Sequence, residues 1–222
     1  MKIHKNIEQW TQERFDIRKL KMTASHAAAI GNCWKWLDTY ILELITEYVS
    51  TWEKKHFSNE HTDRWNELEP IARNLYEMTT WNIVDEVWFI EYEENIWCSP
   101  DGLVWDDGWI EIKCLDDKKH FEMILEWESA IASWYIWQIQ MNLLITWRKR
   151  WDYVWYNPNF KDSLLIYRIY PDEVKFEKLK MWFSLWKTKI KEILYKYEQR
   201  WQDKKNLINL KKNVIAYIYD MI

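Results

Sequence analysis

Two carboxylates and an ammonium around a predicted β-hairpin are side chains of the types that could together bind a metal ion and act on a phosphate. Asp101 precedes one β-rich run, Glu111 and Lys113 lie on the next, and the turn sequence Asp106-Asp107-Gly108 stands between them. An Asp-Gly pair between two such runs is a strong signal for a hairpin. Because side chains alternate along a strand, Glu111 and Lys113 share one face, and the hairpin brings Asp101 toward them.

Two carboxylates crowded together repel each other unless a cation lies between them, and Mg²⁺ prefers oxygen ligands. We therefore expect Asp101 and Glu111 to bind Mg²⁺, with Mn²⁺ as an alternative ion. The backbone carbonyl of Ile112 and the carboxylate of Glu69 are candidates for further ligands. Lys113 would orient an attacking water and stabilise charge on a phosphate. The spacing alone leaves a second interpretation open, a solvated hairpin face with a cross-strand ion pair.

The elements that must position these side chains follow from hydrophobic periodicity and turn signals. Residues 23–30 predict a helix start capped by Thr23 or Ser25, and Pro70 marks a helix that begins or kinks there. Helices are predicted over 7–20, 37–57, 62–78, 122–146 and 173 to about 212, and strands over 83–84, 87–90, 102–104, 110–113, 151–156 and 164–170. This order predicts an α/β fold with a mixed central β-sheet flanked by helices and a long C-terminal helix. We expect a single domain over 1–222, with a core of about 14–170 and a helical extension over 173–222.

Composition narrows the class of protein. Apolar and charged fractions of 48% and 30% are typical of a soluble globular protein, and no apolar run reaches the length of a membrane span. No apolar stretch follows the charged residues at 1–5, so we expect no signal peptide and a cytoplasmic protein. The three cysteines form no C-x-x-C pair, which argues against a zinc ribbon. A net charge of −4 does not exclude a nucleic-acid enzyme, because a local basic groove can coexist with acidic metal ligands.

Four ordered sequence blocks are similar to those of the lambda-type exonucleases, the YqaJ-like viral recombinase family of the PD-(D/E)XK nuclease superfamily. The resemblance covers roughly residues 14–170. The first block is Arg18 with TAS at 23–25, and the second is ELEPIAR at 67–73. The third is CSPDGLV at 98–104 with IEIKC at 110–114, and the last is YIWQIQ at 135–140 with IT at 145–146 and YNP at 156–158.

The resemblance implies a restriction-endonuclease-like core and a Mg²⁺-dependent DNA exonuclease. Such an enzyme hydrolyses phosphodiester bonds from duplex ends, 5′→3′, in phage-type recombination. Arg18, Ser25 and Ser99 fall where the family binds the 5′-phosphate, and Gln138 falls on the glutamine that faces the active site. Implied partners are double-stranded DNA, a single-strand annealing protein and a homo-oligomeric ring, without a membrane. The implied location is the cytoplasm of a bacterium that carries a phage or prophage.

Other interpretations of the same residues stay open. The chain could be a structure-specific endonuclease on this fold, or a catalytically silent DNA-binding subunit. Arg18 could form a surface salt bridge, Gln138 could be a polar residue packed beside the sheet, and His26 is most simply structural. Lysines recur over 175–212, and they either track DNA phosphates or form the solvated face of an amphipathic helix.

Tryptophan and glycine contents are both abnormal. The chain has 19 tryptophans and 3 glycines, where an average composition would give roughly 15 glycines. Many tryptophans stand where the resembled family has glycine, namely Trp34, Trp36, Trp65, Trp81, Trp88, Trp97, Trp105 and Trp147. One hypothesis is that the gene uses UGA for glycine and that UGA was translated as tryptophan. The alternative is an aromatic-rich core or a base-stacking surface. If the sequence is literal, Trp97 and Trp105 crowd the predicted metal site.

Overall fold

The computed structural model describes residues 2–4, 17, 19–28, 34–50, 60–87, 89–93, 96–126, 131 and 133–219. The chain forms two compact units, Met1–Lys180 and Met181–Ile222. The first unit contains both β-sheets and all the predicted site residues that are described. Arg18, Trp88 and most of the helix predicted over 7–20 lie outside the described residues.

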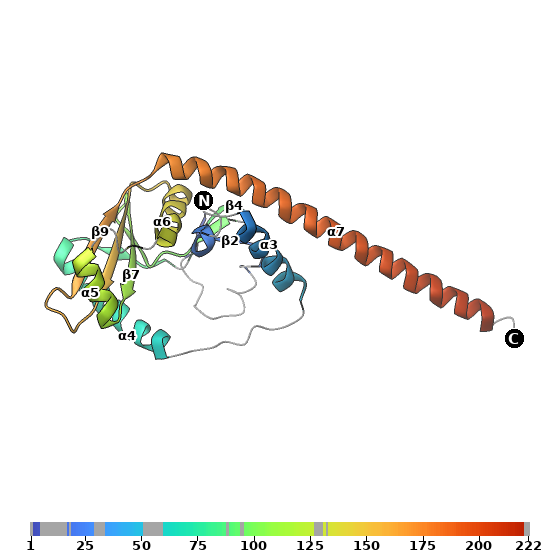
Figure 1. Ribbon diagram of the computed structural model, residues 1–222, viewed down its shortest axis with the longest axis horizontal. Helices are drawn as coiled ribbons and strands as arrows, with labels where there is room; N and C mark the ends of the chain where they lie inside the picture. Colours follow the sequence, from blue (N-terminus) through green and yellow to red (C-terminus); the bar gives the residue numbers. More distant parts are fainter. Residues whose placement is uncertain are drawn as a thin grey trace. The chain divides into compact units, whose positions relative to one another are not determined.

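The larger sheet is mixed, as the sequence predicted, and it contains the predicted hairpin (Figure 1). Its order is β3-β6-β7-β8-β9, with β3 (Val84–Asp85), β6 (Gly102–Val104), β7 (Gly108–Cys114), β8 (Arg150–Tyr156) and β9 (Leu164–Ile169). Strands β7 and β8 are parallel, and the other neighbours are antiparallel. A smaller sheet has the order β1-β4-β5-β2, with β1 (Lys2–His4), β4 (Phe89–Glu93), β5 (Ile96–Cys98) and β2 (Met22–Thr23). Together the two sheets and the helices form the predicted α/β architecture.

The helices depart from prediction in two places. The described helices are η1 (Ala24–His26), α3 (Trp34–Val49), α4 (Glu60–Thr80), α5 (Asp117–Glu126), α6 (Ser133–Thr146) and α7 (Glu173–Tyr219). The single helix predicted over 122–146 is wrong, because α5 and α6 are separate; no glycine or proline marks the break in the sequence. The predicted capping role is also wrong for Thr23, which occupies the N-cap position of η1 without a side-chain capping hydrogen bond. Helix α4 runs through Pro70 and therefore does not begin there.

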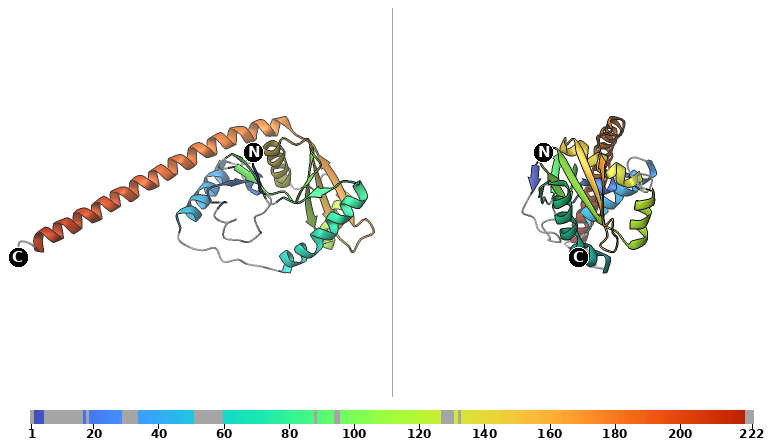
Figure 2. Two further views of the ribbon diagram at one scale, coloured as in Figure 1. Left: turned by 180° about the vertical axis from the view of Figure 1, so that it is seen from behind. Right: turned by 90° about the vertical axis from the view of Figure 1, so that its left-hand side faces the viewer.

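The two faces of the larger sheet are covered differently. Ile110, Ile112 and Val154 point toward α4, where they form a buried cluster with Ala72 and Tyr76. Each such aliphatic side chain contributes roughly 1.5–3 kcal/mol when it is fully buried. On the other side, α6 contacts β8 and also β4, β5 and η1, so it lies between the two sheets (Figures 1 and 2). The polar side chains of β7 therefore emerge where both sheets and α6 meet.

A buried ionic network fixes the register behind the hairpin. Asp152 on β8 is fully buried and accepts hydrogen bonds from the Tyr76 hydroxyl at 2.5 Å and from Arg150 Nη1 at 2.9 Å. Arg168 on β9 adds a third, from Nε at 2.7 Å. Burial and the Asp152 carboxylate together raise the pKa of Tyr76. One carboxylate thus connects α4, β8 and β9, and these are the elements against which β7 is held.

Helix α7 begins at Glu173, as the sequence predicted. Asp172 caps it, because its Oδ1 accepts a hydrogen bond from the Lys175 backbone N–H at 3.1 Å. Gln140 on α6 fixes this junction: its Nε2 donates to the Tyr170 carbonyl, and its Oε1 accepts from the Asp172 amide. Among the described helices, none is apolar over a stretch long enough to cross a bilayer.

Candidate active site

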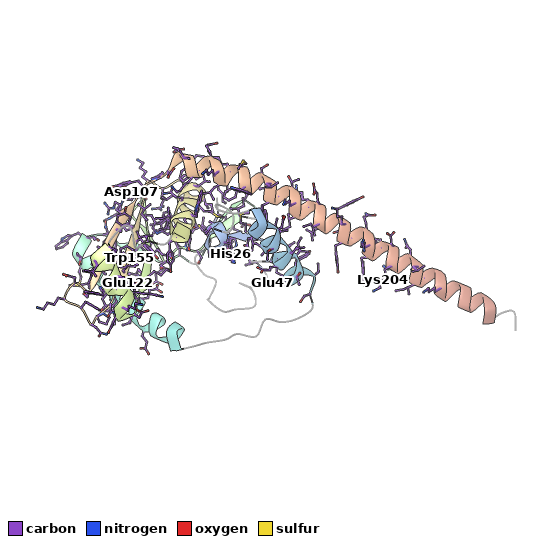
Figure 3. All side chains as sticks on the ribbon, in the orientation of Figure 1. His26, Glu47, Asp107, Glu122, Trp155 and Lys204 are labelled. Carbon is purple, nitrogen blue, oxygen red and sulfur yellow. The ribbon has the colours of Figure 1, made fainter. Side chains whose placement is uncertain are left out.

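The predicted hairpin is formed by β6 and β7, with residues 105–107 as the turn. Gly102 pairs with Ile110, which sets Asp101 beside the middle of β7. A Cβ atom at Gly102 would come within 2.3 Å of Val84 Cγ1, so only glycine allows β3 to pack this closely. At the far end of the hairpin is Asp107, which is labelled in Figure 3. Its backbone carbonyl accepts a hydrogen bond from the Lys149 amide at 2.9 Å. Both ends of the hairpin are therefore anchored to neighbouring elements.

The three residues predicted from spacing do come together. Asp101 Oδ2 accepts a hydrogen bond from the Ile112 backbone N–H at 2.7 Å. Lys113 Nζ lies 2.7 Å from Glu111 Oε1, and the Glu111 side chain is only 6% exposed. The Ile112 amide therefore joins Asp101 to the strand that carries Glu111 and Lys113. This is the arrangement expected from the alternation of side chains along the strand and from the hairpin turn.

The charges in this cluster perturb one another. Burial raises the pKa of Asp101 well above its usual range, and the Glu111 carboxylate raises it further, against the opposing effects of Lys113 and the Ile112 amide. Burial would lower the pKa of Lys113, but Glu111 and Asp101 outweigh it and raise that pKa. Burial also raises the pKa of Glu69, and Arg73 opposes it. The three carboxylates of Asp101, Glu111 and Glu69 therefore outnumber the two cations beside them, Lys113 and Arg73.

The described part of the chain contains no group of three or more His, Cys, Asp or Glu side chains already arranged to hold a metal ion. The residues nevertheless fit a divalent cation. Glu111 Oε2 is buried and has no hydrogen-bond partner among the described residues. Asp101 feels repulsion from both Glu111 and Glu69. A hard cation would supply the partner that this oxygen lacks and would relieve the repulsion.

Glu69 reaches this region from α4. Its Oε1 lies 2.5 Å from Arg73 Nη2, and Arg73 also pairs with Glu86. All three line a pocket of about 70 Å³ together with Ser99 and Asp101. Arg73 ends the ELEPIAR block of the sequence, but neither it nor Glu86 was predicted as a site residue. The four-residue spacing from Glu69 was a signal for the first, whereas only the fold brings Glu86 close.

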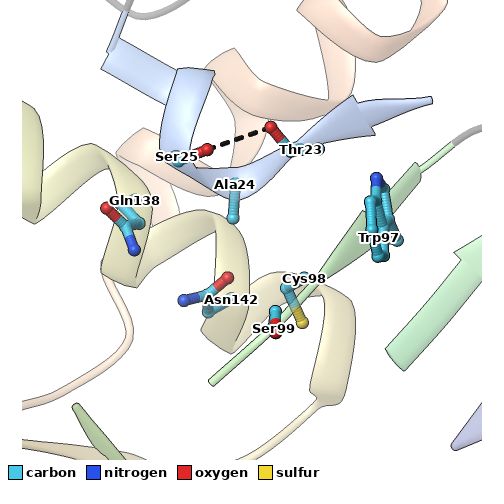
Figure 4. Close-up of a pocket in the computed structure, with 8 residues that line it drawn as sticks. All are labelled: Thr23, Ala24, Ser25, Trp97, Cys98, Ser99, Gln138 and Asn142. Carbon is cyan, nitrogen blue, oxygen red and sulfur yellow. Dashed lines mark hydrogen bonds between the residues drawn. The ribbon is translucent and has the colours of Figure 1, made fainter. Parts of the chain in front are cut away.

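A second pocket, also of about 70 Å³, contains most of the residues predicted to bind a 5′-phosphate (Figure 4). Ser25, Ser99 and Gln138 line it, so the structure brings these three together. Thr23 and Asn142, which were not predicted for this role, complete its polar lining. Asn142 follows Gln138 by one helical turn on α6, a spacing visible in the sequence. Ser99 lines both pockets, and the second pocket therefore adjoins the carboxylate cluster.

His26 is held in place by its neighbours. Its ring stacks on Tyr40 with centroids 4.3 Å apart, and its Nδ1 lies 2.8 Å from Thr23 Oγ1. These contacts support the structural interpretation of this histidine.

Residues 10–149 match the family model described as the YqaJ-like viral recombinase domain. The chain belongs to this family. The YqaJ-like match spans η1, α4, the hairpin and α6, and hence both pockets. None of the curated proteins matches the chain.

Solved structures agree with this YqaJ-like assignment. The chain is similar to an alkaline exonuclease, LHK-Exo from Laribacter hongkongensis, with 30% identity and a TM-score of 0.72 over 85% of this chain and 99% of that one. A complex of LHK-Exo with dAMP matches at 31% identity with the same TM-score and coverage. A phage-related exonuclease from Haemophilus somnus 129PT matches at 17% identity and a TM-score of 0.60, over 82% of this chain and 98% of that one, which shows the fold alone.

The comparisons confirm three predictions: the family, the restriction-endonuclease-like fold, and the enzyme class, a deoxyribonuclease. Nucleases of this kind generally depend on a divalent metal ion.

Proposed function

We propose that this YqaJ-like chain is a Mg²⁺-dependent exonuclease that hydrolyses phosphodiester bonds from the ends of double-stranded DNA, in the 5′→3′ direction. The observation that carries the proposal is the shared wall of the two pockets. Ser99 lies between a carboxylate cluster suited to a cation and a hydroxyl-lined and amide-lined pocket suited to a terminal phosphate. The similarity to LHK-Exo, which has been crystallised with a deoxynucleoside monophosphate, supports it.

Asp101 and Glu111 would hold the ion, with Glu69 and the backbone carbonyl of Ile112 as further ligands. When bound, Mg²⁺ supplies positive charge that makes water a better nucleophile and offsets charge on the scissile phosphate. Lys113 stays protonated, because the two carboxylates raise its pKa. It can therefore orient the attacking water and donate to the phosphate as negative charge develops.

The hydroxyls of Ser25 and Ser99 are proposed to hold the 5′-terminal phosphate, with Arg18 supplying the positive charge. Thr23 is proposed to act beside them, since its Oγ1 lies 3.0 Å from Ser25 Oγ. Gln138, on the same pocket wall, would contact the terminal nucleotide. An end held here places the first internucleotide phosphate toward the carboxylates, which is what removal of one nucleotide at a time requires.

The biological setting that we propose follows from the family. The enzyme would act in phage-type recombination, in the cytoplasm of a bacterium that carries a phage or prophage. There it would work with a single-strand annealing protein, and it would encircle DNA as a homo-oligomeric ring.

The experiment that tests the activity compares labelled linear duplex DNA with covalently closed circles, in Mg²⁺ and in excess chelator. We expect degradation of linear DNA only, with Mg²⁺ only, and earlier release of a 5′ label than of a 3′ label. Cleavage of closed circles would instead indicate an endonuclease, and release of the 3′ label first would reverse the proposed polarity.

Asp101→Asn is the matched active-site control, because the amide keeps the side-chain shape but removes the charge. We expect a loss of roughly 10²-fold or more in rate, typical of removing one electrostatic contact to a transition state. Binding of a linear duplex in Ca²⁺ should persist. A variant that degrades DNA at the parent rate would refute the assignment of Asp101, and binding without any cleavage by the parent protein would indicate a silent DNA-binding subunit.

A further inference from the structure

The backbone takes a left-handed conformation at four described residues other than glycine, and three of the four are tryptophans. The φ angles are 58° at Trp81, 49° at Trp105 and 60° at Trp147, and the fourth residue is Leu20 at 58°. No described glycine has a positive φ. Glycine is the residue that adopts this conformation without steric cost, whereas a bulky side chain there is an outlier.

Two of these tryptophans end helices in the way that glycine ends them. The Trp81 amide donates to the Glu77 carbonyl at 2.9 Å directly after α4. The Trp147 amide donates to the Leu143 carbonyl at 3.0 Å directly after α6. A left-handed residue whose amide closes the last helical turn is the common helix C-terminal motif, and glycine is its usual occupant. Trp105 opens the hairpin turn, another position where glycine is favoured.

The side chains at these positions are mostly solvent-exposed. Trp81 is 88% exposed, Trp147 is 78% exposed and Trp105 is 55% exposed. Trp105 makes one hydrogen bond, from its Nε1 to Asn82 Oδ1 at 2.8 Å. Large apolar rings at strained and exposed positions gain little of the burial that stabilises tryptophan elsewhere.

Other tryptophans have the environment that an indole requires. Trp109 and Trp151 lie on the central strands, are fully buried and have ring centroids 6.0 Å apart. Trp109 Nε1 donates to Thr146 Oγ1 at 2.7 Å, and the Arg148 guanidinium lies 4.8 Å from the centre of the Trp109 ring. These five tryptophans thus fall into two structural classes: Trp109 and Trp151 belong to the core, whereas Trp81, Trp105 and Trp147 occupy positions that favour glycine.

We propose that positions 81, 105 and 147 are glycine in the protein made by the cell, because the gene encodes them with UGA and its host reads UGA as glycine. One reassigned codon explains the left-handed φ angles at these three positions, and its use at further tryptophan positions would account for the excess of tryptophan and the deficit of glycine. Trp109 and Trp151 are encoded by UGG. The proposal rests on backbone conformation and is independent of the proposed nuclease activity.

The test reads the codons of the gene and the residues of the natural protein. The protein is purified from the cells that carry the gene, and its tryptic peptides are sequenced by mass spectrometry. We expect UGA codons and glycine at positions 81, 105 and 147, and UGG codons and tryptophan at 109 and 151. UGG at any of the first three positions, or tryptophan in their peptides, would overturn the proposal. Glycine at 109 or 151 would also overturn it, because backbone conformation would then not separate the two classes.

Discussion

Replacing the three left-handed tryptophans by glycine should stabilise the protein. The variant is Trp81→Gly/Trp105→Gly/Trp147→Gly in the sequence as printed. A residue with a Cβ costs roughly 1–2 kcal/mol in the left-handed region. Glycine returns roughly 0.4–1 kcal/mol of that through the greater freedom of the unfolded chain. The net gain is therefore about 0.5–1 kcal/mol at each position.

One contact opposes this gain. The Trp105 indole donates to Asn82 at 2.8 Å, and its loss costs roughly 0.5 kcal/mol, since the bond is exposed to water. The three substitutions lie at the C-termini of α4 and α6 and at the hairpin turn. Hydrogen bonds from Trp105 to Asn82 and from Arg148 to the Trp105 carbonyl connect these sites, so the sum of the three effects is an order-of-magnitude value. The expected total is about 1–2.5 kcal/mol, which corresponds to a rise in Tm of roughly 2–10 °C for a protein of this size.

Urea unfolding followed by far-UV circular dichroism measures this difference without depending on tryptophan fluorescence. Trp109→Gly is the matched control, because it makes the same chemical change at a buried position. Removing a large buried aromatic side chain costs roughly 3–5 kcal/mol, so this variant should be strongly destabilised. A triple variant that unfolds at lower urea than the parent, with the same slope, would refute the reasoning from backbone strain.

Three further predictions concern titration, the buried network and the two glutamines of α6. Because the pKa of Asp101 is raised, this carboxyl binds a proton more tightly in the folded state than in the unfolded state. Without metal, the Tm should therefore fall as the pH rises above the ordinary carboxyl range. Thermal melts with and without Mg²⁺ check this, and a fall that persists in Mg²⁺ or in Asp101→Asn would contradict it. Asp152→Asn should cost roughly 1.5–3 kcal/mol in urea unfolding, since it removes the buried anion to which Arg150 and the partly exposed Arg168 donate, while activity per folded molecule is retained. Gln140→Ala should cost roughly 2 kcal/mol of stability, because it leaves two backbone groups unpaired, and it should spare activity. Gln138→Ala should instead lower the rate on 5′-phosphorylated ends and spare stability. Equal effects of the two substitutions on the rate would contradict this distinction.

The juxtaposition of Asp101, Glu111 and Lys113, the proposed catalytic triplet, was predictable because its information is local. The turn sequence predicts a hairpin, the period of two puts Glu111 and Lys113 on one face, and the pairing of β6 with β7 brings Asp101 to the Ile112 amide. The strands β8 and β9 were predictable for the same reason. The break between α5 and α6 was not, because the apolar pattern continues through it and neither glycine nor proline interrupts the sequence there.

The surroundings of the triplet depended on contacts between segments far apart in the chain. Glu86 reaches Arg73 only because β3 packs beside the end of α4, and Asn142 reaches Ser99 only because α6 lies between the two sheets. Asp152 would be taken from the sequence for a surface acid on a strand, yet Arg150 and Arg168 enclose it.

The excess of tryptophan illustrates both what the sequence determines and what only the tertiary structure decides. Composition alone showed that glycine is too rare and tryptophan too common, but it did not separate Trp109 from Trp147. The family resemblance placed Trp147 and not Trp109 at a glycine position, and the tertiary structure gave the physical reason, since burial and the sign of φ depend on where the whole chain places each backbone segment. The sequence by itself determined the chemistry on the hairpin, because neighbouring residues create it. The fold decided which side chains surround that chemistry, because distant residues meet only when the sheets and helices pack.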